Sequence, residues 1–261
     1  MSNSSSIEIS KKRKPKWLRV KLPTGENYKQ VRSLVDDYKL HTICESGHCP
    51  NMGECWGAGT ATFMILGNTC TRSCGFCNVA TGRPLPVDWD EPDRVGRSIK
   101  LMKVKHAVIT SVDRDDLSDG GSIIWAETIN AIRRISPGTT METLIPDFRG
   151  IENQMDRILE AAPEVISHNM ETVRRLTRQV RIQAQYDRSL GVLKYLKDNG
   201  AHRTKSGIML GLGENEKEIY QVMDDMRSAN IDFLTIGQYL QPTVKHHKVE
   251  KYVDPIKFKK F

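Results

Sequence analysis

The chain has 261 residues, of which 38% are hydrophobic and 27% are charged, and its formal net charge is +7. This composition is typical of a globular protein, and the length fits one large domain or two small ones. No apolar run approaches the roughly 18 residues of a membrane helix, and the first residues lack the apolar core of a secretory signal. We therefore expect a cytoplasmic protein, without a membrane anchor, whose cysteines stay reduced.

The sequence divides into two parts. Residues 1–60 show little regular pattern apart from a helical stretch at 28–38, so we expect an irregular N-terminal extension. From residue 61 to 261, short apolar runs rich in β-branched residues alternate with amphipathic stretches. In chain order these runs predict strands at 61–66, 106–111, 141–145, 165–168, 207–210 and 233–238. Between and after them the pattern predicts helices at 92–103, 122–135, 154–161, 170–176, 188–199 and 216–229.

Strands that alternate with helices indicate parallel βαβ units. Six strands fit either an open doubly wound sheet or a partial barrel. The nucleotide-binding motifs G-x-G-x-x-G and G-x4-G-K-[ST] are missing after the first strand. We therefore favour an α/β fold, a partial (β/α)6 TIM-like barrel over 61–261. Functional residues of such barrels lie at the carboxyl ends of the strands, which is where Cys70 falls, directly after the first strand.

All six cysteines lie between residues 44 and 77, in two triplets. Cys44, Cys49 and Cys55 have the spacing C-x4-C-x5-C, and the later three have the spacing C-x3-C-x2-C: Cys70, Cys74 and Cys77. Clustered cysteines in a reducing compartment predict a metal site, and thiolates suit zinc or iron–sulfur centres. Structural zinc normally takes four ligands, whereas three thiolates leave one iron of a four-iron cube open. The triplets therefore favour two 4Fe–4S clusters, with zinc as the alternative.

The second triplet, in Gly67-Asn-Thr-Cys70-Thr-Arg-Ser-Cys74-Gly-Phe-Cys77, resembles the signature of the radical S-adenosylmethionine enzymes, including the aromatic Phe76 before the last cysteine. The resemblance implies that the open iron binds the amino and carboxylate groups of S-adenosylmethionine. It also implies that one electron from the cluster cleaves the sulfonium and releases a 5′-deoxyadenosyl radical.

The first triplet and several later segments resemble the lipoyl synthase family over roughly residues 14–261. These segments include residues 110–121, 142–150, 168–173, 205–214 and 235–243. The resemblance implies insertion of two sulfur atoms at C6 and C8 of a protein-bound octanoyl group, with an auxiliary cluster as sulfur source and two S-adenosylmethionine molecules cleaved. It also implies specific partners: octanoylated lipoyl carrier domains (2-oxoacid dehydrogenase E2 subunits and the glycine cleavage H protein) and an electron donor such as flavodoxin or ferredoxin.

The chain departs from this family at one important place. The family's serine ligand to the auxiliary cluster lies in an Arg-Ser-Ser-Tyr motif, but the last serine in this sequence is Ser228. Either the chain is truncated or that tail is not represented. Without the motif, the fourth iron of the first cluster has no family ligand here, and His41 and His48 are nearby alternatives. The net charge predicts steering of an acidic protein partner. The basic runs lie near the termini without aromatic interleaving, so we expect no nucleic-acid site, and we expect a monomer.

Three polar residues near strand ends are candidates to bind S-adenosylmethionine. Glu142 and Asn169 could hydrogen-bond the ribose or the ammonium group, and Arg181 could pair with the carboxylate. Each has a structural alternative. Glu142 could form an internal salt bridge, Asn169 could cap the next helix, and Arg181 could lie on a solvated face. Two other functions stay open from the sequence, a different radical enzyme with an auxiliary cluster and a non-catalytic iron–sulfur protein.

Overall fold

A six-stranded parallel sheet organises the part of the chain that the computed structural model describes, residues 15–18, 32, 33 and 62–261. The strands lie side by side in the order in which they occur in the chain. They are β1 (Thr62–Ile65), β4 (His106–Ser111), β5 (Thr140–Leu144), β6 (Val165–Ser167), β7 (Thr204–Leu210) and β8 (Phe233–Gln238).

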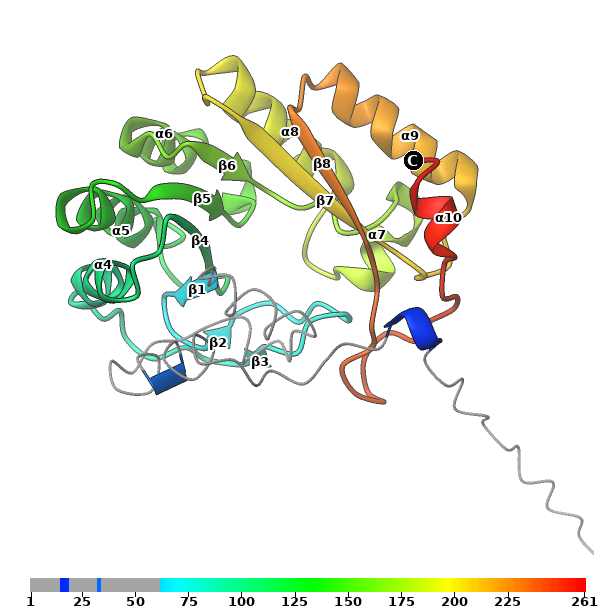
Figure 1. Cartoon of the computed structure of the whole chain (residues 1–261), viewed down its shortest axis with the longest axis horizontal. Helices are drawn as coiled ribbons and strands as arrows, with labels where there is room; N and C mark the ends of the chain where they lie inside the picture. The colour runs from blue at the N-terminus through cyan, green and yellow to red at the C-terminus, as the bar shows by residue number, and fades with distance from the viewer. Residues whose placement is uncertain (1–14, 19–31, 34–61) are drawn as a thin grey trace, which may run out of the picture.

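Helices follow these strands and cover one face of the sheet. Because parallel crossovers are right-handed, a sheet with sequential strand order receives all its crossover helices on one side. Figure 1 shows the strands in an arc with α4, α5, α6, α8 and α9 on the convex side. The predicted partial barrel is therefore confirmed, whereas a doubly wound sheet would carry helices on both faces. The helices are α4 (Glu91–Leu101), α5 (Ser122–Ile135), α6 (Glu152–Ala161), α7 (Arg174–Val180), α8 (Tyr186–Asp198) and α9 (Glu216–Ser228).

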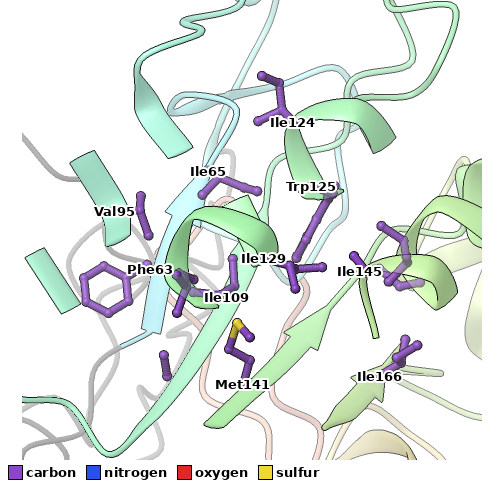
Figure 2. Close-up of a cluster of buried hydrophobic side chains, with 14 of the residues drawn as sticks. Phe63, Ile65, Val95, Ile109, Ile124, Trp125, Ile129, Met141, Ile145 and Ile166 are labelled. Carbon is purple, nitrogen blue, oxygen red and sulfur yellow. The ribbon is translucent and has the colours of Figure 1, made fainter. Parts of the chain in front are cut away.

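The main hydrophobic core lies between the convex face of the sheet and the first helices. Strand side chains such as Phe63 and Ile109 pack against Trp125 and Ile129 of α5, and all four are fully buried. Figure 2 shows these side chains converging between β1, β4 and the helices. Alternate residues of each strand face the concave side. The carboxyl ends of the strands meet at one rim of the arc.

The structure corrects one predicted helix. A helix was expected to begin at Met170, but α7 begins at Arg174. The reason is that Glu171 has a left-handed φ of 65° and forms a parallel bridge with Ile208 of β7. Its backbone therefore pairs with β7 in a conformation that a helix does not allow.

Several short elements were not predicted. Two two-residue strands, β2 (Thr69–Cys70) and β3 (Ala80–Thr81), pair at the base of the cysteine loop. The others are single turns: η1 (Lys16–Leu18), η2 (Phe148–Gly150) and α10 (Pro255–Phe258).

Part of the sequence prediction falls outside the described residues. Of the helix expected at 28–38, only Arg32 and Ser33 are described, and both are helical. The first cysteine triplet, His41 and His48 are not described. Among the described residues, no helix combines the length and the apolar character of a membrane span.

We predict that Ile129→Ala destabilises the protein by about 2–5 kcal/mol, because it empties a fully buried position of the core. Ile123→Ala in the same helix is the matched control, since that side chain is 39% exposed. Urea unfolding of both variants checks the prediction. Equal losses of unfolding free energy would contradict it.

Candidate active site

A cavity of about 220 Å³ opens at the carboxyl ends of the strands. Three thiols from the loop after β1 line it: Cys70, Cys74 and Cys77. The other lining residues include Asp113 after β4, Asp147 after β5, Asn169 and Glu171 after β6, and Arg181 after α7. The sequence prediction that the second triplet lies on this rim is therefore confirmed. Segments that are far apart in the sequence meet here because every parallel strand ends at the same edge.

Arg72 holds the cysteine loop in place. Its guanidinium is 5% exposed, yet it carries a full charge between the first two cysteines of the triplet. It donates to Asp115 (2.7 Å from Nε) and contacts Asp147 (2.8 Å) and Asp113 (3.3 Å). Asp147 is fully buried and also accepts from Arg188 of α8 at 3.1 Å. A buried charge is stable only when paired in this way, so the loop is bound to the ends of β4 and β5.

The Cys70 sulfur receives two backbone N–H groups. The amides of Arg72 and Asp113 donate to Sγ at 3.4 and 3.3 Å. Such hydrogen bonds favour a thiolate and tune the potential of an iron–sulfur centre. Among the described residues, no three Cys, His, Asp or Glu side chains converge on one point, as a single metal ion would require. In a cube each thiolate binds a separate iron, so three thiols spread around one cavity fit a cluster better than zinc.

Burial raises the pKa of each thiol. The pKa of Cys70 is about 11 and that of Cys74 about 12, chiefly because the apolar surroundings disfavour the thiolate. The pKa of Cys77 is also raised by burial. At neutral pH these thiols are therefore protonated before they bind metal, and metal binding must release their protons.

Two of the three predicted S-adenosylmethionine contacts, Asn169 and Arg181, line the cavity. Asn169 also hydrogen-bonds the Glu171 side chain. Glu142 is not among the lining residues. Its carboxylate accepts from Lys205 Nζ at 2.8 Å and from Ser167 Oγ at 2.8 Å on the inner face of the sheet. The structure thus places Glu142 in the internal salt bridge that the sequence left open as an alternative, and its contact with S-adenosylmethionine stays a prediction.

Arg181 is oriented by a buried chain of hydrogen bonds. Its Nη1 donates to Ser189 Oγ (3.2 Å), which lies 2.9 Å from His168 Nε2. His168 Nδ1 lies 2.9 Å from the carbonyl oxygen of Ile145, which can only accept. Nδ1 therefore carries the proton, and neutral Nε2 accepts from the serine hydroxyl. Burial and the nearby Arg181 charge lower the pKa of His168 to about 4, which keeps this chain intact at neutral pH.

Sequence reasoning missed several residues that build the site. They are Arg72, Asp113, Asp147, His168 and Glu171, none of which the sequence analysis singled out. The sequence feature that could have identified them is their position, either directly after a predicted strand or inside the cysteine loop. Which of several neighbouring charged residues turns inward depends on loop conformation, which no local pattern encodes.

The family models agree with this geometry. A model of the radical SAM superfamily matches residues 64–226, and a model of the N-terminal domain of lipoyl synthase matches residues 2–49. A protein of Flavobacterium johnsoniae named lipoyl synthase is 72% identical over 248 residues, which are 95% of this chain and 86% of the relative. The chain belongs to the lipoyl synthase family.

An equally similar protein comes from a second organism. One from Nematostella vectensis, named mitochondrial lipoyl synthase, is 72% identical over 95% of this chain and 85% of its own length. Membership of the radical SAM superfamily implies a 4Fe–4S cluster and S-adenosylmethionine, which the cysteine-lined cavity fits.

Solved structures share the fold at low sequence identity. The FeFe-hydrogenase maturase HydG of Carboxydothermus hydrogenoformans aligns with a TM-score of 0.63 and 14% identity over 90% of this chain and 61% of its own. Methylornithine synthase aligns with a TM-score of 0.57 and 14% identity over 91% of this chain and 70% of its own. At this identity the likeness supports the partial barrel alone.

The buried histidine predicts a pH dependence of stability. The folded-state pKa of His168 is about 4, below its unfolded value of 6.5, so the folded state disfavours the charged ring. The stabilisation is complete above pH 6.5 and is lost as pH falls toward 4, by about 3 kcal/mol in all. Urea unfolding across this range should show the loss of unfolding free energy. In His168→Gln this pH-dependent loss should be absent. An unchanged slope in His168→Gln would assign the pH dependence to other groups.

Proposed function

We propose that this protein inserts two sulfur atoms at C6 and C8 of an octanoyl group bound to a carrier protein, as a sulfurtransferase. One observation carries the proposal: the C-x3-C-x2-C thiols line one cavity at the carboxyl rim of a barrel whose relatives at 70–72% identity are named lipoyl synthase. Breaking unactivated C–H bonds is beyond any side-chain base, so a cofactor-derived radical is required.

The cavity residues support specific roles in holding S-adenosylmethionine. When bound, the cluster on the second triplet supplies the electron that cleaves the sulfonium. Arg181 has a fixed guanidinium and can pair with the methionine carboxylate. Asn169 and Glu171 together present an amide and a carboxyl group at the cavity wall and can hydrogen-bond hydroxyl or ammonium groups. Glu142 supports this wall indirectly, because its partner Lys205 lies two residues before Gly207, which faces Asn169.

A second 4Fe–4S cluster on Cys44, Cys49 and Cys55 is proposed as the source of both sulfur atoms. These residues lie outside the described part of the chain, so the proposal rests on their spacing and on the lipoyl synthase N-terminal match over residues 2–49. Two S-adenosylmethionine molecules are consumed per product, since two hydrogen atoms are removed.

The proposed substrates are octanoylated lipoyl carrier domains, namely 2-oxoacid dehydrogenase E2 subunits and the glycine cleavage H protein. A flavodoxin or ferredoxin is the proposed electron donor. A monomeric state stays a prediction. The bacterial relatives support a cytoplasmic location, with mitochondria as the alternative that the Nematostella relative suggests.

Mass spectrometry of a carrier domain tests the proposal. An octanoylated lipoyl domain is incubated anaerobically with the iron-loaded protein, S-adenosylmethionine and dithionite. We expect a mass increase that corresponds to two inserted sulfur atoms, with two hydrogens fewer once the dithiol is oxidised to the disulfide. Formation of 5′-deoxyadenosine without any thiolated product would instead favour a radical enzyme with another substrate.

The two cysteine triplets should be separable by substitution. We predict that Cys74→Ala abolishes 5′-deoxyadenosine formation, because the electron source loses a ligand. Cys49→Ala should retain 5′-deoxyadenosine formation but give no thiolated product, because the sulfur source is lost. Liquid chromatography of both products checks this. Loss of 5′-deoxyadenosine in Cys49→Ala would indicate that the first triplet supports the fold instead.

Gly207 provides a test of the role of Asn169. A Cβ at Gly207 would lie 2.9 Å from Asn169 Oδ1 and from Thr235 Oγ1, so Gly207→Ala must displace the amide. We predict about tenfold weaker S-adenosylmethionine binding, the loss expected for one hydrogen bond of about 1–1.5 kcal/mol. Gly237→Ala in the adjacent strand is the control, because nothing lies within 4 Å of its added Cβ. Isothermal titration with S-adenosylmethionine measures both, and equal affinities would remove Asn169 from the site.

A further inference from the structure

The cysteine loop has an outer side, opposite the cavity, that the proposed reaction leaves unexplained. Gly75 lies between two segments on that side. Its amide donates to the Val180 carbonyl at 2.8 Å, and its carbonyl accepts from the His247 amide at 2.7 Å. The end of α7 and the segment 243–248 therefore meet over the loop.

Further contacts hold the two segments on the loop. His246 Nε2–H donates a hydrogen bond to the Cys77 carbonyl oxygen at 2.9 Å. On the other flank, the Ser73 amide donates to Gln183 Oε1 at 3.3 Å. The loop and its two flanking segments thus form one continuous structure directly outside the three thiols.

This structure presents apolar and cationic side chains to solvent. Ile182 is 61% exposed and Val244 is 87% exposed, one on each flanking segment. Arg178, Lys245 and Lys248 are exposed in the same two segments. We call these five residues, together with Ser73, the outer loop surface.

The three cations have no anionic partner in the part of the chain that the structure describes. No hydrogen bond or ion pair with another described residue engages the charged groups of Arg178, Lys245 or Lys248. The neighbouring arginines of α7 differ in this respect. Arg174 pairs with Asp187 at 2.6 Å, and Arg175 pairs with Glu218 at 2.6 Å. Arg178 could serve only to complement the carboxyl end of α7, but that explains neither the two lysines nor the exposed Ile182 and Val244.

We propose that the outer loop surface is the docking site for an acidic one-electron carrier protein. Exposed apolar side chains with a rim of unpaired cations suit a small, transient interface with a negatively charged partner. Electron transfer weakens steeply with distance, and this surface is separated from the cavity only by the loop that bears the cysteines. One electron leaves the reduced carrier and enters the cluster, and no bond or proton changes at the interface.

The inference rests on the proposed function, because only a cluster held by Cys70, Cys74 and Cys77 needs this electron. It assigns different sides of the loop to different tasks. S-adenosylmethionine occupies the cavity side and the protein donor the outer side, so both can be bound at once. The lipoyl carrier domain is also expected to be acidic, but its octanoyl arm must reach the cavity.

Charge reversal combined with two reductants tests the inference. Lys245→Glu/Lys248→Glu is compared with Lys100→Glu/Lys105→Glu, which changes the net charge equally at exposed positions on α4 and before β4. The 5′-deoxyadenosine formed is measured in the full-length, iron-loaded protein. One series uses photoreduced flavodoxin and the other uses dithionite, which needs no docking site.

We expect the outer-surface variant to lose about tenfold or more of the flavodoxin-driven rate at low salt, as electrostatic steering predicts. Its dithionite-driven rate should equal that of the unmodified protein, and its salt dependence should flatten. The control variant should keep both rates. Ile182→Ser/Val244→Ser should also lower the flavodoxin-driven rate alone, without a change of charge.

Three results would overturn the inference. The first is an unchanged flavodoxin-driven rate, and the second is an equal loss in the control variant. The third is an outer-surface variant that makes 5′-deoxyadenosine normally with either reductant but no longer thiolates the octanoyl domain, which would assign the surface to the lipoyl carrier. If the unmodified protein forms no 5′-deoxyadenosine even with dithionite, the proposed function itself fails, and this outcome is distinct from the other three.

Discussion

The buried guanidinium of Arg72 is the interaction on which the site depends. It lies inside the cysteine triplet and contacts three carboxylates from the loops after β4 and β5, one of which, Asp147, is fully buried. Removing one partner of a buried pair costs about 3–5 kcal/mol, because the other charge is left without compensation. The cluster loop is therefore anchored by charges that belong to the protein itself. Through Asp147 and Arg188 the same network reaches α8, so one set of ion pairs links the loop, two strand ends and a helix.

Backbone strain at Glu171 links the sheet to the cavity. This residue adopts a left-handed φ of 65°, which is unfavourable for a residue with a Cβ, and it is held there by backbone bonds to Gly207 and Met209 of β7. The consequence is a side chain directed to the cavity wall beside Asn169. The late start of α7 has the same origin, so the fold and the site share one constraint.

The cysteine loop separates two environments. On its inner side, polar groups are buried and the thiol pKa values are raised. Charges interact strongly in such a site because water is excluded. On its outer side, apolar and cationic side chains meet solvent. With the proposed docking site, a small molecule and a protein donor approach the same centre from opposite sides of this loop.

The sequence by itself determined the architecture and the chemical class of the protein. Strand β4 and helix α5 match their predicted ranges, since apolar periodicity and turn residues act over short distances. The C-x3-C-x2-C spacing likewise predicted a cluster, because ligand spacing within one loop is a local property. The tertiary structure alone decided which polar residues face the cavity. Glu142 is paired with Lys205, 63 positions away, while Asp113 and Glu171 turn inward, as long-range register and loop conformation dictate. Charge pairing between distant segments leaves no periodic trace in the sequence, and only folding brings the partners together.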